Sequence, residues 1–276
     1  MDGTARHGGS IAFIGGGNMA RAIIGGLVAG GHAARDVLVV EPLAPQRDAL
    51  SAELGVRAIS AADATLASAA LVVWAVKPQV FRAAAEPCRP HVAAALHLSV
   101  MAGIRSDAIA AAAGTERVVR AMPNTPALIG MGVAGLYARP AASADDRRRV
   151  ERILAPTGRT LWVEREADLD AVTALSGSGP AYVFYFVEAM MQAAAEMGLS
   201  PEQGRQLALA TFTGAAELAR RSDEPVQVLR ERVTSKGGTT FAALQALDSD
   251  GVKAAFVRAL KAAQQRAREL GDEFGG

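Results

Sequence analysis

The pattern of apolar and polar positions divides the chain into two parts. Over the first 164 residues, short apolar runs alternate with alanine-rich segments of helical spacing. Runs of this kind are typical of strands buried on both faces of a parallel sheet. They occupy residues 11–14, 36–41, 57–60, 70–76, 96–100, 117–122, 131–138 and 159–164. The alternation predicts an α/β domain over residues 1–164, with a doubly wound sheet of the Rossmann type.

From residue 165 onward the strand-like runs stop and helical periodicity takes over. Helices are predicted at residues 181–199, at 201–221, from Pro225, from Phe241, and at 252–270. We therefore expect residues 165–276 to form a second, all-helical domain. Its first long helix is apolar almost all round, and such a helix is buried either in its own domain or in a partner. Because so small a domain has few helices to cover it, we expect the interface of a homodimer there.

Composition narrows the classes of function. The chain has 276 residues, half of them hydrophobic, and a formal net charge of +1, which fits two packed domains and gives no sign of a nucleic-acid partner. Cys88 is the single cysteine, and paired Cys/His spacings do not occur, so we expect no metal and a reducing compartment. No stretch, residues 1–10 included, has the apolar length of a signal peptide or membrane helix, which favours a cytoplasmic location.

A glycine-rich turn follows the first predicted strand and opens a helix. Its pattern is G-x-G-x-x-A, formed by Gly15, Gly17 and Ala20. In a dinucleotide site, Gly15 permits the tight turn, Gly17 lets a pyrophosphate approach the backbone, and Ala20 lets helix and strand pack closely. The alternative is a tight turn without a ligand. The position between a strand and a helix near the start of the chain favours the dinucleotide interpretation.

The second predicted strand ends at Glu41, about twenty residues after the glycines, where an acid binds the adenosine ribose in such folds. A carboxylate there disfavours a 2′-phosphate and points to NAD, but Arg47 lies close enough in sequence to compensate. The chemistry therefore leaves NADH and NADPH both open. Glu41 has a simpler interpretation as a solvated residue at a strand end.

Two later strands also end in candidate binding loops, because ligands of such sheets bind at the carboxyl ends of the strands. Lys77 is one of only four lysines and follows one of these strands, although Pro78 would also stop the strand and leave the lysine in solvent. In the other loop, prolines on either side of Asn124 and Thr125 impose an extended backbone. An amide and a hydroxyl held this way suit a nicotinamide, while a rigid turn is the alternative.

The helical part contains one loop rich in hydrogen-bond donors. Residues 233–240 read VTSKGGTT, with glycines surrounded by hydroxyls and a lysine just before a predicted helix. Free N–H groups at a helix start suit an anion such as a carboxylate. The alternative is an ordinary helix cap by Thr239 or Thr240. The density of donors favours the anion site.

The chain resembles the pyrroline-5-carboxylate reductase family in five stretches: GGGNMA (15–20), AVKPQ (75–79), MPNTP (122–126), SGSGPAY (176–182) and VTSKGGTT (233–240). The resemblance extends from residue 11 to about 270. It implies reduction of L-1-pyrroline-5-carboxylate to L-proline with NADPH or NADH, the last step of proline biosynthesis. It also implies a Rossmann domain and a helical domain that builds an interlocked homodimer, in many members assembled further into a decamer.

The resemblance also implies roles for individual residues. The phosphate-binding turn comprises Gly15, Gly17, Asn18 and Met19. The loop beside the nicotinamide ribose comprises Ala75, Val76, Lys77 and Pro78, and the nicotinamide lies near Asn124 and Thr125. The substrate carboxylate lies at Ser235, Gly237, Gly238 and Thr239, and Thr240 is the donor to the ring nitrogen. Many NADP-preferring members have an Asn-Arg or Ser-Arg pair where this chain has Glu41-Pro42.

The chemistry of an imine agrees with this picture. A protonated imine already carries the charge that favours hydride transfer, so no histidine or aspartic acid need be present. The four histidines, at positions 7, 32, 91 and 97, all lie outside the candidate loops. A hydroxyacid dehydrogenase would need a general acid or base on a helix, whereas Lys236 lies in a glycine loop. A dinucleotide-sensing protein without turnover is the other alternative, and the intact substrate loop disfavours it.

Overall fold

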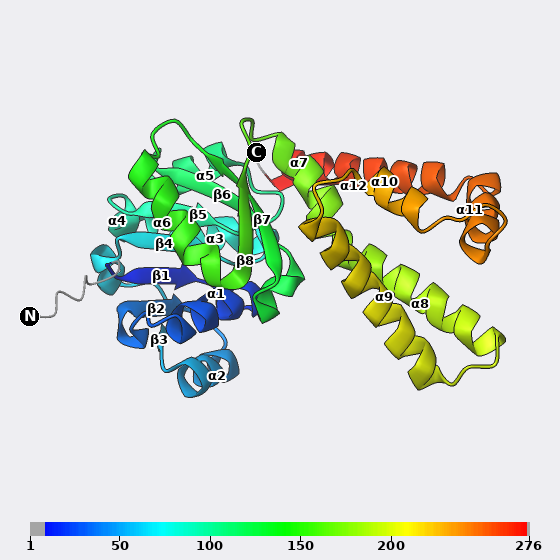
Figure 1. Cartoon of the computed structure of the whole chain (residues 1–276). Helices are drawn as coiled ribbons and strands as arrows, with labels where there is room; N and C mark the ends of the chain where they lie inside the picture. Colours follow the sequence, from blue (N-terminus) through cyan, green and yellow to red (C-terminus); the bar gives the residue numbers. More distant parts are fainter. Residues whose placement is uncertain (1–8, 275–276) are drawn as a thin grey trace, which may run out of the picture. The chain divides into compact units, whose positions relative to one another are not determined.

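The computed structural model describes residues 9–274 of the chain (Figure 1). His7 and most of the N-terminal stretch considered above lie outside this range. The described chain forms two compact units. One comprises residues up to 178 together with residues from 263 onward, and the other is Gly179–Ala262.

The division into units falls later than the expected boundary between residues 164 and 165. After the last strand the chain forms α7 (Asp168–Val172), whose Leu169 is buried. A side chain at Gly135 would meet Val172 at 2.7 Å, so α7 lies directly against the sheet. The end of the last helix also belongs to the first unit, a return that helical periodicity does not reveal.

The first unit is built on an eight-stranded sheet with the order β3-β2-β1-β4-β5-β6-β7-β8. The strands are β1 (Ile11–Ile14), β2 (Val37–Val40), β3 (Arg57–Ile59), β4 (Leu71–Trp74), β5 (Leu96–Ser99), β6 (Val118–Met122), β7 (Gly132–Ala138) and β8 (Gly158–Trp162). All neighbours are parallel except β6 and β7, which are antiparallel. The doubly wound sheet is thus confirmed, but the reversal at β7 was not predicted. The β6–β7 connection carries only the 3-10 helix η4 (Thr125–Ile129), and so short a connection cannot make a parallel crossover.

Helices cover both faces of this sheet (Figure 1). They are α1 (Asn18–Ala29), α2 (Ala44–Leu54), α3 (Phe81–Ala85), α4 (Arg89–Val92), α5 (Ser106–Ala113), α6 (Ala144–Leu154) and α7. The central strand β1 supplies apolar side chains to both layers, with Ile11 and Phe13 in one cluster and Ala12 and Ile14 in the other. No residue of β1 is more than 2% exposed, which confirms a strand buried on both faces.

His97 on β5 belongs to the core and is fully buried. The Trp74 indole N–H donates to His97 Nδ1 at 2.9 Å, and His97 Nε2 lies 3.0 Å from the Val92 carbonyl oxygen. Because an indole can only donate, Nδ1 is the acceptor and Nε2 carries the proton. Burial lowers the pKa of His97 to about 4, so the ring is neutral near pH 7.

The second unit is entirely helical within the described residues. It contains α8 (Gly179–Glu196), α9 (Pro201–Arg221), α10 (Val226–Arg232), α11 (Thr239–Ser249) and the first part of α12 (Val252–Phe274). Helix α9 begins with a capping box, in which Ser200 and Gln203 each accept from the other's backbone N–H. The predicted helices are therefore present, although α11 begins two residues before Phe241.

Helix α8 is not enclosed by its own unit. Tyr182 and Phe186 pack edge-to-face against Phe256 of α12, with ring centroids 5.8 Å and 5.6 Å apart. Phe184 and Tyr185 of the same helix nevertheless remain 59% and 68% exposed. Of the two alternatives for an apolar helix, burial inside its own domain is thus not realised. Among residues 9–274 no helix is long and apolar enough to cross a membrane.

Candidate functional site

The first unit brings two of the predicted loops into contact at the carboxyl end of the sheet. Gly15 has φ 99°, a conformation that favours glycine. A Cβ at this position would lie 2.6 Å from the Ala75 carbonyl oxygen and 2.9 Å from Val76 Cγ1. The Ala75 N–H donates to the Ile14 oxygen at 2.8 Å. The glycine turn after β1 and the loop after β4 therefore pack directly together. This tight packing is expected whether or not the turn binds a dinucleotide.

The start of α1 offers uncommitted donors and open space. Gly17 is the N-cap residue, and no side chain caps the helix. The first N–H groups of a helix have no partner within it and carry its positive end. A Cβ on Gly17 would meet nothing within 4 Å, whereas Ala20 is fully buried against the sheet. Donors facing open space at a glycine fit the pyrophosphate of a dinucleotide.

Two further residues of this turn differ in exposure. Asn18, the first residue of α1, is exposed, and Met19 is partly buried against the core. In the loop after β4, Lys77 precedes the 3-10 helix η3 (Pro78–Val80), is exposed, and makes no ion pair within residues 9–274. Its ammonium group is accordingly available at the rim of the carboxyl edge.

Glu41 is a buried part of the glycine turn rather than a solvated residue at a strand end. It is 6% exposed. Its Oε2 accepts the Gly16 N–H and its Oε1 accepts the Leu43 N–H, both at 3.0 Å. Arg47 Nη1 donates to the carbonyl oxygens of Glu41, at 2.9 Å, and Pro42, at 2.7 Å. Sequence reasoning placed Glu41 at the ribose but missed its contact with Gly16.

The loop after β6 is held from inside by Asn124. The backbone is extended at this residue, as the flanking prolines predicted. The side-chain Oδ1 accepts the Val133 N–H at 2.9 Å, and Nδ2 donates to the Ser176 oxygen at 3.2 Å. Thr125 begins η4 and is exposed, and η4 packs against α1. Asn124 therefore braces the loop, and Thr125 presents the exposed hydroxyl.

Ser176 lies in a π-helical turn (Thr173–Gly177) between α7 and α8. The Ser178 N–H donates to the Thr173 oxygen at 2.9 Å, five residues back. A side chain on Gly177 would meet Met122 Cε at 2.5 Å, so glycine lets this turn approach the end of β6. Single π-helical turns inside helices are frequent at functional sites. Helical periodicity alone did not reveal it.

An ion pair between a buried arginine and a half-buried glutamate next to the β6 loop was also missed. Arg120 on β6 is 8% exposed, and its Nη1 donates to Glu166 Oε1 at 2.7 Å. The same oxygen accepts the N–H of Ser106, the first residue of α5, at 2.6 Å, and the Ser106 hydroxyl donates to the other carboxylate oxygen. Glu166 thus ties the segment after β8 to the strand that carries the β6 loop. The sequence feature that could have revealed this ion pair is Arg120 itself, because a charged side chain within an apolar strand requires a partner.

The loop of the second unit leaves its donors free. Helix α11 begins at Thr239, with Gly238 as N-cap and no side-chain cap. The capping alternative for Thr239 or Thr240 is therefore wrong. Gly237 has φ 75°, and a Cβ on Gly238 would lie 2.5 Å from Ser235 Oγ, so the two glycines allow a tight exposed turn. The free backbone N–H groups at the start of α11, beside the hydroxyls of Ser235, Thr239 and Thr240, can hold a carboxylate.

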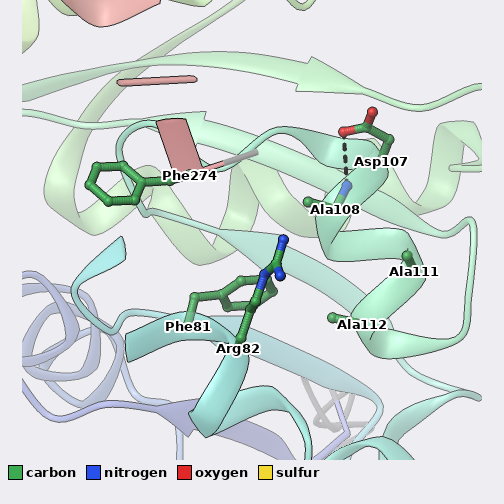
Figure 2. Close-up of a pocket in the computed structure, with 7 residues that line it drawn as sticks. All are labelled: Phe81, Arg82, Asp107, Ala108, Ala111, Ala112 and Phe274. Carbon is green, nitrogen blue, oxygen red and sulfur yellow. Dashed lines mark hydrogen bonds between the residues drawn. The ribbon is translucent and has the colours of Figure 1, made fainter. Parts of the chain in front are cut away.

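Two other features bear on the chemistry. Residues 9–274 contain no group of His, Cys, Asp and Glu side chains that could hold a metal. A cavity of about 450 Å³ lies in the first unit between α3, α5 and the end of α12 (Figure 2). It is lined by Phe81, Arg82, Asp107, Ala108, Ala111, Ala112 and Phe274. None of the predicted site residues is among them, so this largely apolar cavity stands apart from the loops described above.

Two family models match the chain. The one described as pyrroline-5-carboxylate reductase dimerisation matches residues 166–270, and the one described as NADP oxidoreductase, coenzyme F420-dependent, matches residues 10–103. Together they cover the glycine turn, the loop after β4 and the hydroxyl-rich loop at residues 233–240 of the second unit.

Similar proteins extend over nearly the whole chain. A pyrroline-5-carboxylate reductase of Pseudomonas aeruginosa is 42% identical over 96% of this chain and 98% of its own length, and one of Pisum sativum is 33% identical over 95% and 96%. Among solved structures, that of a pyrroline-5-carboxylate reductase from Coxiella burnetii has a TM-score of 0.89 at 36% identity, covering 96% of this chain and 99% of that one. The pyrroline carboxylate reductase of Plasmodium falciparum, with NADP bound, has a TM-score of 0.85 at 28% identity, over 95% and 98%.

Proposed function

The chain belongs to the pyrroline-5-carboxylate reductase family, and we propose on this basis that it reduces L-1-pyrroline-5-carboxylate to L-proline with NADH or NADPH. The observation that carries the proposal is the match over nearly the full length, which includes both the glycine turn of the first unit and the hydroxyl-rich loop of the second. The biosynthesis of proline is the corresponding role.

The first unit binds the cofactor. When bound, the reduced nicotinamide supplies the hydride. The uncapped amides at the start of α1, next to Gly17, hold the pyrophosphate, and Glu41 faces the adenosine ribose. Ala75 to Pro78 line the nicotinamide ribose. Thr125 contacts the nicotinamide from the loop that Asn124 braces.

The second unit binds the substrate. Ser235, with the amides of Gly237, Gly238 and Thr239, holds the carboxylate. The Thr240 hydroxyl lies at the ring nitrogen and donates to it as hydride addition to the imine carbon gives this nitrogen a lone pair. The substrate enters as the protonated imine, so the hydride adds to the imine carbon and the nitrogen keeps its proton as the charge is neutralised. Because no protein group has to deliver this proton in the transition state, a neutral threonine suffices. Placing the two reactants together is then the main work of the enzyme.

Assembly and location complete the proposal. The exposed aromatic side chains Phe184 and Tyr185 support a homodimer interface on α8. Following the resemblance, we propose that such dimers assemble further into a decamer. A cytoplasmic location is supported by Cys88, which is unpaired and buried.

The proposed roles are tested by three alanine variants of one loop, assayed with pyrroline carboxylate. Thr240→Ala should lower kcat, since one lost hydrogen bond to the reacting ring is worth about 1 to 3 kcal/mol. Ser235→Ala should mainly raise KM, because a carboxylate contact is similar in the ground and transition states. Thr234→Ala is the matched control, since its hydroxyl is already bonded to the Arg230 oxygen at 2.6 Å.

Thermal midpoints separate chemistry from folding in these variants. Since no side chain caps α11, Thr240→Ala should melt close to the wild type. A folded Thr240→Ala enzyme with the kcat of the wild type would contradict the assignment. So would a Thr234→Ala variant that loses as much turnover as Thr240→Ala.

A further inference from the structure

We propose that Glu41 makes this enzyme prefer NADH over NADPH, because its carboxylate is built into the glycine turn where the adenosine ribose of the cofactor lies. The inference rests on the proposed function, since it concerns the cofactor of the same reaction. It goes further by naming one coenzyme and the residue that selects it.

The carboxylate of Glu41 is fixed by the backbone. Each oxygen accepts one N–H, from Gly16 and from Leu43, at 3.0 Å. A carboxylate oxygen has room for a second donor, so both oxygens still accept a hydroxyl. They donate nothing when ionised. Glu41 therefore presents acceptors only, in a form that suits the two hydroxyls of a ribose.

The surroundings keep the carboxylate in this place. A Cβ on Gly16 would lie 2.5 Å from Leu50 Cδ1 and 3.3 Å from Glu41 Oε2. Leu50 is fully buried, so this wall cannot move aside without disturbing the core. Position 16 is free in the G-x-G-x-x-A pattern, but here it must be glycine for Glu41 to sit beneath the turn. The packing around Gly16 and Leu50 therefore holds the Glu41 carboxylate beneath the turn.

A 2′-phosphate would bring a second negative charge to the same place. The repulsion is strong because Glu41 is 6% exposed and water screens a buried charge poorly. A phosphate oxygen also has no hydrogen to offer an acceptor, so the hydrogen bonds of the ribose hydroxyl are lost. Both effects act against NADPH and leave NADH untouched.

The neighbouring cations do not cancel this charge. Arg47 is half-buried, and its Nη1 is bonded to the carbonyl oxygens of Glu41 and Pro42 rather than to the Glu41 carboxylate. Arg21 is the one cation of helix α1, and it is paired with Glu53 at 3.3 Å. The buried carboxylate is therefore the dominant charge facing the ribose.

The test is equilibrium binding of NADH and of NADPH to the full-length protein without substrate, followed by nicotinamide fluorescence or calorimetry. The wild type should bind NADH at least about tenfold more tightly than NADPH, a typical cost for juxtaposed like charges. Glu41→Gln keeps the size and removes the charge, so the preference should shrink by about tenfold or more. Glu86→Gln, at an exposed glutamate of the same unit that makes no ion pair among residues 9–274, is the control and should leave the ratio unchanged.

The outcomes separate this inference from the proposed function. Equal or tighter binding of NADPH by the wild type would overturn the inference and leave the reductase assignment standing. A folded Glu41→Gln variant that keeps the wild-type ratio of affinities would also overturn the inference. So would a wild type that prefers NADPH and loses NADPH binding when Arg47 is replaced by alanine. Binding of neither dinucleotide would instead contradict the proposed function itself. The ratio of NADH to NADPH affinity in the wild type can be measured whether or not any variant folds.

Discussion

Acidification should destabilise this protein through His97. The ring is fully buried, with Nδ1 accepting from Trp74 and Nε2 donating to the Val92 oxygen. A proton added at Nδ1 would point at the indole N–H and break that hydrogen bond. Burial is the main cause that lowers the pKa of His97 to about 4. The bond to Val92 acts in the opposite direction, and the charge of Arg117 adds to the lowering.

The sign and size of the effect follow from proton linkage. The unfolded chain, with an ordinary histidine pKa of 6.5, binds the proton more readily than the folded chain. The stabilisation is therefore fully present above pH 6.5 and is lost as the pH falls toward 4. At 1.36 kcal/mol per pH unit, lowering the pH to 5 removes about 2 kcal/mol per chain, and lowering it to 4 removes about 3 kcal/mol.

Urea unfolding at pH 7 and pH 5, at one protein concentration, measures this loss. His97→Asn keeps an acceptor for Trp74 but cannot take up a proton, so its unfolding free energy should fall about 2 kcal/mol less between the two pH values than that of the wild type. Carboxylates with lowered pKa values, such as Asp146 and Asp168, are common to both chains and cancel in the difference. Equal losses in the two proteins would refute the reasoning.

Two further predictions concern the cofactor turn and assembly. Gly17→Val fills the open space before α1 and should abolish binding of either dinucleotide in a folded protein, while Gly25→Ala, whose Cβ would make only an ordinary 3.6 Å contact, should bind normally. Wild-type affinity in folded Gly17→Val would remove Gly17 from the site. Light scattering at micromolar concentration should give the mass of a dimer or of a multiple of it, and Tyr185→Glu, which puts a charge on the exposed face of α8, should lower that mass. An active wild-type monomer would contradict the assignment of this face.

Local features of the fold were predictable from the sequence. The apolar run at residues 11–14 and the glycines after it determine β1 and its turn through neighbouring residues alone. The antiparallel placement of β7 was not predictable in this way, because it depends on which partner a strand meets after a short connection. The return of α12 to the first unit is likewise a matter of tertiary packing.

The candidate site shows the same limit. Motifs identified Glu41 and Asn124, but the chain around them did not reveal that both side chains are engaged with the backbone. The partners are distant in sequence, since Glu41 meets Gly16 and Asn124 reaches Ser176. An arginine in the apolar strand β6 signalled a missing partner without identifying Glu166. Spacing locates a loop, whereas the contacts that hold it form only in the folded chain.

The central claim is hydride transfer from a reduced nicotinamide to the imine carbon of pyrroline carboxylate. It is tested most directly with NADH that carries deuterium at both C4 positions, with the product examined by NMR and mass spectrometry. The account predicts proline with one deuterium at Cδ, the former imine carbon, formed in step with cofactor oxidation. It predicts no comparable cofactor oxidation with a 2-oxo acid. Proline that lacks the deuterium, or faster turnover of the 2-oxo acid, would contradict it.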